Sequence, residues 1–174
     1  MPLTFKDIPQ FPHAAYKVHV PWNHIESHLE NLAEGKGGLD LDPDFQRAHV
    51  WTEEQQRAYV EYQLMGGEVS QTIVFNCPGW MKRSDEGTVQ LVDGKQRLEA
   101  VRKFMRGDLK VFGQTVEEFG RFPSMHYLLQ FSVCALETRE EVLSLYLNIN
   151  AGGTPHSKKE LDKVRKLLEK ERSK

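Results

Sequence analysis

Alternation of apolar and polar side chains along the chain predicts a series of short β-strands. Each predicted strand is followed by glycine, proline or charged residues, where a chain commonly turns. The strands expected from this pattern cover residues 16–20, 72–75, 89–92, 109–112 and 129–136. An extended acidic segment, residues 39–46, lies between the first two.

Apolar residues spaced three and four positions apart predict helices between these strands. Three helix starts carry a capping box, in which a hydroxyl and a longer polar side chain three residues later satisfy two backbone amides. The three pairs are Thr52 with Gln55, Thr138 with Glu141, and Ser157 with Glu160. Because strands and helices interleave in roughly equal number, we expect an α+β fold with a mixed sheet and flanking helices.

The length and composition are typical of one folded domain. The chain has 174 residues, of which 39% are hydrophobic and 28% are charged. We expect the domain to span residues 1–174, with an irregular arm over 1–15 and a basic helix over 156–174. That helix is either a solvated surface helix or a surface for nucleic acid or a partner.

The net charge and the cysteines limit the classes of partner and the cellular compartment that we expect for this protein. The net charge is −2, so any contact with nucleic acid must come from a local basic patch. The two cysteines lie far apart in the sequence, which suits a reducing compartment. Because there is no membrane-length apolar run and no signal-peptide core, we expect a cytoplasmic protein without membrane contact.

The strongest local candidate for chemistry is the junction between the strand at 89–92 and the helix that follows. Asp93 ends the strand, Gly94 allows a tight turn, and Lys95, Gln96 and Arg97 open the helix. The first amides of a helix lack internal partners and favour anions, so the junction predicts a phosphate site. Asp93 is either a catalytic or Mg²⁺-binding carboxylate, or a helix N-cap.

Two other polar segments also lie at the ends of regular elements, where ligands commonly meet a rigid scaffold. Gln46 and Arg47 precede one helix, and a run of asparagines and glycines follows another. Arginine can hold two phosphate oxygens at once, which makes Arg47 and Arg97 the best anion ligands. The candidate residues of the later segment are Asn148, Asn150, Gly152, Gly153 and Thr154.

A loop between two predicted strands is the best candidate for contact with DNA. Trp80, Lys82 and Arg83 combine an aromatic ring with two cations, a combination suited to a nucleic-acid strand. Packing inside the protein is the alternative role for the tryptophan.

Three motifs in a fixed order produce a family resemblance. They read Phe-Gln-Arg followed by Val-Trp-Thr-Glu-Glu-Gln, then Leu-Val-Asp-Gly-Lys-Gln-Arg-Leu, then Leu-Asn-Ile-Asn-Ala-Gly-Gly-Thr-Pro. From about Pro21 to Leu161, the chain resembles the N-terminal domain of GmrSD-type modification-dependent restriction enzymes, within the ParB/sulfiredoxin-like superfamily. The resemblance implies a nucleotide-handling pocket around an Asp-Gly-Gln-Gln-Arg motif. The residues that match are Asp93, Gly94, Gln96, Arg97, Gln46, Arg47, Asn150, Gly152 and Gly153.

The resemblance also implies cofactors and a class of activity. Enzymes of this type use nucleoside triphosphate hydrolysis to control DNA cleavage, so Mg²⁺, a nucleoside triphosphate and DNA are expected here, and a second copy of the chain is a further candidate partner. Two departures stand out: Lys95 replaces the usual glutamine, and no His-Asn-His nuclease pattern follows before Lys174. A short version of this kind suits a phage or mobile element.

Three functions therefore remain open. The first is a nucleoside-triphosphate-dependent hydrolase or nickase that acts on DNA. The second is a kinase that transfers the γ-phosphate to a hydroxyl, such as one on a modified DNA base. The third is a non-catalytic nucleotide- or DNA-binding module, or an inhibitor of host restriction.

Overall fold

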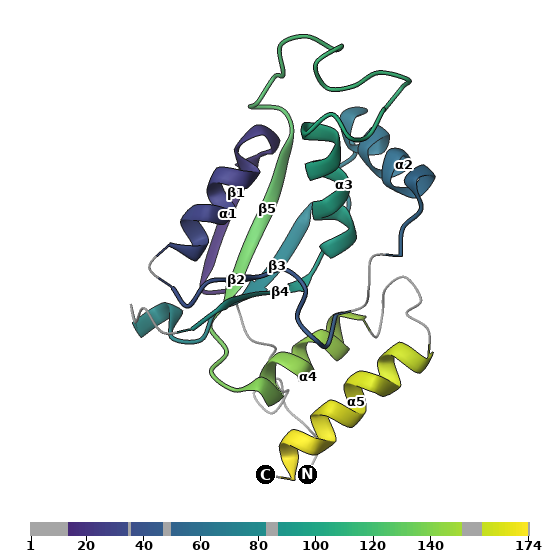
Figure 1. The fold of residues 1–174 in the computed structure, drawn as a ribbon. Coiled ribbons are helices and arrows are strands. Elements are labelled where there is room, and N and C mark those ends of the chain that lie inside the picture. Colours follow the sequence, from purple (N-terminus) through teal and green to yellow (C-terminus); the bar gives the residue numbers. More distant parts are fainter. Residues whose placement is uncertain (1–13, 35, 47–49, 83–86, 151–157, 174) are drawn as a thin grey trace, which may run out of the picture.

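A five-stranded mixed sheet forms the centre of the computed structural model (Figure 1). The structure describes residues 14–34, 36–46, 50–82, 87–150 and 158–173. The strands are β1 Tyr16–Pro21, β2 Leu39–Asp40, β3 Thr72–Asn76, β4 Val89–Asp93 and β5 Leu128–Cys134. Their order is β1-β5-β3-β4-β2, with β5 parallel to β3 and β4 parallel to β2, while the other two pairs are antiparallel. The predicted α+β mixed-sheet fold is confirmed.

Helices account for most of the remaining regular structure. They are α1 Ile25–Ala33, α2 Glu53–Leu64, α3 Lys95–Met105, α4 Arg139–Asn150 and α5 Lys158–Arg172, with short 3₁₀ turns η2 Trp22–His24 and η3 Trp80–Lys82. The capping boxes predicted at Thr52 and Thr138 are both present. The third, at Ser157, lies outside the described residues. None of the helices that the structure describes is long and apolar enough to cross a membrane.

The strand predicted over residues 109–112 is wrong. The chain there makes a tight turn, and its only ladder contact in the described structure is a single bridge between Val111 and Gln114. Phe112 and Gly113, between them, have φ angles of +50° and +80°. Positive φ is incompatible with a β-strand, so the apolar run 109–112 turns back on itself instead of extending.

One face of the sheet is covered by α1 and α3, which lie side by side across it (Figure 1). Alternate strand residues point into this layer and are almost completely buried. The main contributors from the strands are Ile73, Phe75, Leu91, Leu129 and Phe131, and those from the helices are Ile25, Leu29, Leu98, Val101 and Phe104.

The opposite face of the sheet holds a second, smaller apolar cluster. Val92 and Cys134 point into it from the strands, and α4 and α5 cover it. Phe45, which follows β2, also packs here, with its ring 5.4 Å from that of Tyr146 on α4. The segment after β2 and the helix α4 therefore pack together against this face of β4.

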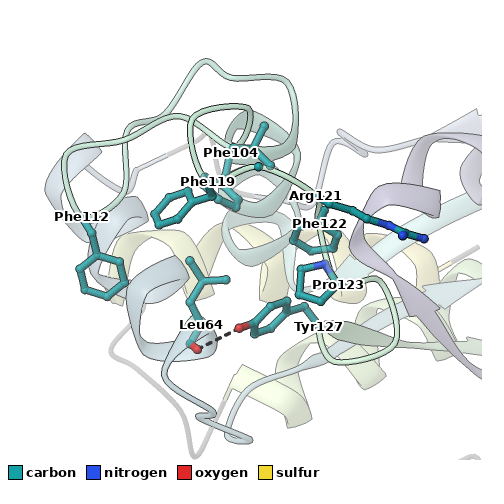
Figure 2. Close-up of a pocket in the computed structure, with 10 residues that line it drawn as sticks. Leu64, Phe104, Phe112, Phe119, Arg121, Phe122, Pro123 and Tyr127 are labelled. Atoms are coloured by element: carbon teal, nitrogen blue, oxygen red, sulfur yellow. Dashed lines mark hydrogen bonds between the residues drawn. The ribbon is translucent and has the colours of Figure 1, made fainter.

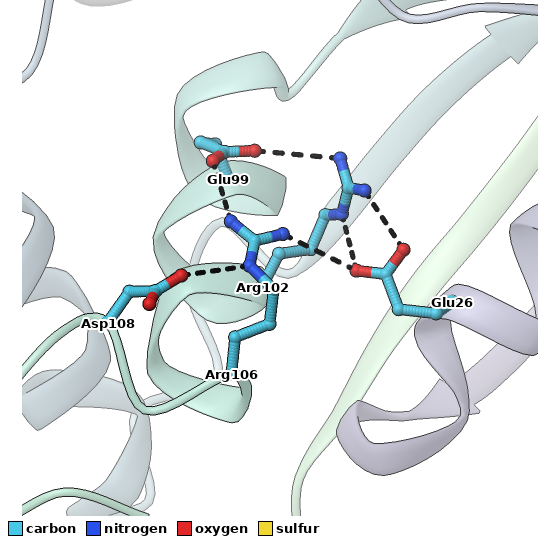
Figure 3. Close-up of polar contacts among 5 residues, drawn as sticks. All are labelled: Glu26, Glu99, Arg102, Arg106 and Asp108. Atoms are coloured by element: carbon cyan, nitrogen blue, oxygen red, sulfur yellow. Dashed lines mark hydrogen bonds and ion pairs between the residues drawn. The ribbon is translucent and has the colours of Figure 1, made fainter.

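A network of ion pairs links α1 to α3 on the surface (Figure 3). Arg102 binds Glu26 with two hydrogen bonds, of 2.7 and 2.9 Å, and Arg106 joins Glu99 and Asp108 at 3.1 Å each. The hydrogen bonds from Arg102 lower the pKa of Glu26. This network fixes the position of α3 relative to α1.

Asn76 → Ala is expected to lower the free energy of unfolding by about 3 kcal/mol, because two buried backbone groups lose their partner. The Asn76 side chain is fully buried; its Nδ2 donates to the Leu136 carbonyl at 3.1 Å and its Oδ1 accepts from the Leu136 amide at 2.8 Å. Denaturant unfolding measures the change. Asn31 → Ala, on the exposed face of α1, is the control and should shift stability by less than about 0.5 kcal/mol. Equal values for the two variants would contradict the assignment.

His28 is expected to make the protein less stable in mild acid. Its ring packs edge-on against Phe131 at 5.3 Å, and burial lowers its pKa. The unfolded chain therefore takes up a proton near pH 6.5 that the folded state resists, so the free energy of unfolding falls as pH drops from about 7.5 to about 5.5. His28 → Phe should flatten this dependence. Parallel pH profiles for the two proteins would show that His28 is not the cause.

Candidate functional site

The turn between β4 and α3, residues 93–97, is built around a glycine that no other residue can replace without strain. Gly94 has a φ of +98°, a left-handed conformation that favours glycine. A Cβ atom placed on it would lie 2.7 Å from Cδ1 of Ile73 and 3.2 Å from Nη2 of Arg97. Both the backbone angle and the close packing against β3 therefore require glycine here.

Asp93 and Arg97 form an ion pair across this turn. Nη2 of Arg97 lies 2.6 Å from Oδ2 of Asp93 and also donates to the Thr72 carbonyl at 3.0 Å. The two side chains keep 27% and 21% of their surface exposed, so a ligand can reach them. The alternative role of Asp93 as an N-cap is wrong. The N-cap is Gly94, and no side chain in the described part of the chain caps this helix.

Gln96 points into the protein and binds a segment that is distant in the sequence. It is 5% exposed, and its Oε1 accepts the amides of Val50 and Trp51 at 3.0 Å each. These two residues lead directly into α2. A glutamine at the start of one helix thus positions the start of another.

Gln46 makes a similar contact between its side chain and a distant backbone segment, here the end of β4. Its Nε2 donates to the carbonyls of Leu91 and Val92, at 3.0 and 2.6 Å. Gln46, just before residues 47–49, is therefore attached to β4, and Val50, just after them, is attached to α3. Arg47 itself lies outside the described residues.

The third polar segment begins at the end of α4, which lies on the opposite face of the sheet from α3. The end of α4 packs through Tyr146 and Ile149 into the cluster that holds Phe45 and Val92. Asn150 donates from Nδ2 to the Tyr146 carbonyl at 2.7 Å, and Asn148 is exposed. The remaining predicted residues, Gly152, Gly153 and Thr154, lie outside the described part of the chain.

Lys95 lies on the side of the turn that faces β2. It forms an ion pair with Asp42, and its side chain is 17% exposed. Beside it is an open groove of about 420 Å³. The groove is lined by Leu41, Asp42, Leu91, Lys95, Leu98, Glu99, Arg102 and Lys103.

Tyr59 and Thr72 belong to this neighbourhood but were not among the residues singled out from the sequence. Burial raises the pKa of Tyr59 to about 12, and the nearby Arg97 opposes part of that rise. The Tyr59 hydroxyl donates to the Ser70 carbonyl at 2.9 Å. Thr72 on β3 accepts a hydrogen bond from Arg97, and Tyr59 on α2 lies near the same guanidinium; local sequence pattern carries no sign of these tertiary contacts.

The residues predicted to bind DNA lie elsewhere. η3 adjoins the beginning of β4, whereas Asp93 is at its end. The Trp80 ring lies 5.5 Å from that of Tyr16 and packs against the core, with Nζ of Lys36 5.5 Å from the Trp80 centroid. Lys82 pairs with Glu137 at 3.1 Å, and Arg83 lies outside the described residues. The structure does not bring these residues to the β4–α3 turn.

No group of three or more potential metal ligands occurs in the part of the chain that the structure describes. The β4–α3 turn has a single carboxylate, Asp93.

A comparison with known protein families identifies the family of this chain. Residues 28–126 match the family described as "GmrSD restriction endonuclease, N-terminal domain". No curated protein and no solved structure matches the chain. The matched residues cover more than half of the sequence, including Gln46 and the β4–α3 turn, while the end of α4 lies beyond them. The chain therefore belongs to the family of GmrSD restriction endonuclease N-terminal domains.

Proposed function

We propose that this domain binds a nucleoside triphosphate with Mg²⁺ at the β4–α3 turn and carries out phosphoryl chemistry that depends on DNA. The observation that carries the proposal is that Gln46 and the Asp93–Arg97 turn meet at one helix start, whose N-cap, Gly94, has no side chain. Uncapped helix starts favour phosphate, because their amides point outward and the helix dipole is positive there.

The groups available at the turn fit a metal–nucleotide complex. Mg²⁺ commonly takes one or two protein carboxylates and completes its six positions with water and phosphate oxygens. Asp93 supplies one carboxylate, of which Oδ2 is hydrogen-bonded to Arg97. A single partly exposed carboxylate therefore suits a metal that arrives on a nucleotide.

Each residue of the turn then has a distinct role. Lys95 and the first amides of α3 bind phosphate oxygens, and Arg97 holds the Asp93 carboxylate in place. Bound Mg²⁺ would neutralise charge on the phosphate oxygens. Asp93 would hold the metal and would accept the proton of the water that attacks the γ-phosphorus, while the bond to the bridging oxygen breaks and the nucleoside diphosphate leaves.

Gln46 and Gln96 act as positioning residues in this proposal. Their side chains bind backbone groups of β4 and of residues 50–51, and so attach Gln46 and Val50 to the β4–α3 junction. Such support keeps reactive groups in the correct geometry, and its loss commonly costs activity without removing any reacting atom.

DNA is the partner that the family suggests, because the matching family is described as a restriction endonuclease. We infer that DNA binding and nucleotide turnover are coupled in this domain. The basic helix α5 and the exposed cation Lys82 are the candidate surfaces for that contact outside the turn.

Asp93 → Asn is expected to lower Mg²⁺-dependent release of γ-phosphate about 100-fold or more, because it removes the proton acceptor and the charge that faces the metal. The measurement is phosphate release with each nucleoside triphosphate, with and without DNA. Glu53 → Gln is a matched control. Glu53 forms the same kind of i, i+4 pair, with Arg57 at 2.8 Å, but on the exposed surface of α2. Equal turnover by the wild type and Asp93 → Asn would refute the assigned role.

The destination of labelled γ-phosphate separates the three functions. Label in inorganic phosphate indicates hydrolysis, and label on DNA indicates a kinase. Binding of the nucleotide without any product would identify a non-catalytic module. The proposal expects inorganic phosphate, in larger amounts when DNA is present.

A further inference from the structure

A cavity of about 380 Å³ opens at the other end of α3, and its walls are mostly aromatic (Figure 2). Its volume is within the usual range of sites for small ligands, roughly 300–1,000 Å³. Most of its lining comes from the segment between α3 and β5, residues 106–127. The side chains that line it include Leu64, Phe104, Phe112, Phe119, Phe122 and Tyr127.

Phe112 occupies this cavity's edge in an unfavourable backbone conformation. It has a φ of +50°, and Gly113 after it has +80°. A turn with positive φ at both central positions favours asparagine or glycine, and a bulky aromatic residue is rare there. The side chain gains little from burial, since it is 51% exposed. Stability alone therefore does not explain a phenylalanine at this position.

The turn that carries Phe112 is firmly held. Its ends exchange hydrogen bonds of 2.9 and 3.0 Å between Val111 and Gln114. From α2, Glu61 accepts the Phe112 amide at 3.1 Å, and Arg57 donates to the Lys110 carbonyl at 3.0 Å. The exposed ring is thus presented on a rigid support, as expected for a contact surface that is ordered before the ligand arrives.

The inner walls of the cavity are rigid as well. Phe119 packs on Phe104 at 6.2 Å, and Phe122 packs on Tyr127 at 5.6 Å. Behind them, Trp22 contacts Phe104, Phe122 and Tyr127, and it is 2% exposed. A connection as long as 106–127 without helix or strand is uncommon inside a domain and often has a binding role.

We propose that this aromatic cavity binds one unstacked nucleobase of a DNA strand. Flat aromatic walls fit a flat ligand, and bases stack on phenylalanine and tyrosine whatever their identity. Arg121 lies at the rim, extends away from the cavity, and forms no ion pair with any described residue (Figure 2). It is available to the phosphate that would remain outside when the base enters.

This inference rests on the proposed action on DNA and adds a recognition site to it. The cavity adjoins the end of α3, whereas the nucleotide site is at its start, and the helix has 11 residues. At about 1.5 Å per residue, the two sites are roughly 15 Å apart. Both lie on one rigid helix within the matched family region, so base recognition and phosphoryl chemistry can act together.

Phe112 → Asn tests the proposal because it should weaken DNA binding without lowering the free energy of unfolding. Asparagine suits the positive φ, so the free energy of unfolding should rise or stay unchanged. The loss of a stacking surface should weaken binding to a single strand of about 12 nucleotides by roughly tenfold. Fluorescence anisotropy with a labelled strand and the intact protein measures the affinity.

A strand with the same backbone but abasic sites isolates the contribution of the base. Wild-type protein should bind the base-bearing strand roughly tenfold more tightly than the abasic strand, and Phe112 → Asn should remove the difference. Met125 → Ala, an 82% exposed apolar residue of the same loop, is the control and should keep it. Equal affinities of the wild type for both strands would overturn the base site and leave the proposed DNA contact in place. No binding to either strand would overturn both.

Discussion

The hydrogen bonds from the amides of Val50 and Trp51 to Gln96 are the contacts on which the candidate site depends. They are made by a side chain that is almost completely buried, so removing it would leave two amides without their partner. Through them the start of α3 determines where α2 begins, and α2 in turn holds Tyr59 and Arg57. Gln46 adds a second attachment to β4. The side chains of Gln46 and Gln96 therefore hold together three segments: the one after β2, the start of α2 and the β4–α3 turn.

The two ends of α3 make different contacts and border different candidate sites. The N-terminal end has Gly94 against β3, the Asp93–Arg97 pair and the anion-favouring helix start. The C-terminal end is anchored by the Arg102 and Arg106 ion pairs and borders the aromatic cavity. A helix fixed at both ends keeps the two proposed binding sites at a constant separation.

Local patterns were sufficient to predict most of the fold. The capping boxes at Thr52 and Thr138, the glycine turn after β4 and the main strands all follow from residues close together in the sequence. The strand expected over 109–112 failed because an apolar run says nothing about the sign of φ, and Phe112 has a positive value.

For the candidate site, the sequence singled out Asp93, Arg97, Gln46 and Gln96 but carried no information on most of their contacts. Asp93 and Arg97 are four residues apart on one turn, so their pairing is local. Gln46 and Gln96 contact backbone groups 45 or 46 residues away, and no local pattern contains that information. The aromatic cavity likewise combines Leu64 of α2 with residues of a distant loop.

The central claim is that a nucleotide binds at the start of α3. Titration of isotopically labelled protein with a non-hydrolysable nucleoside triphosphate and Mg²⁺, followed by amide chemical shifts, tests it most directly. The account predicts saturable shifts at Gly94–Arg97, transmitted through Gln96 to Val50 and Trp51. Shifts confined to other surfaces, or none at all, would contradict it.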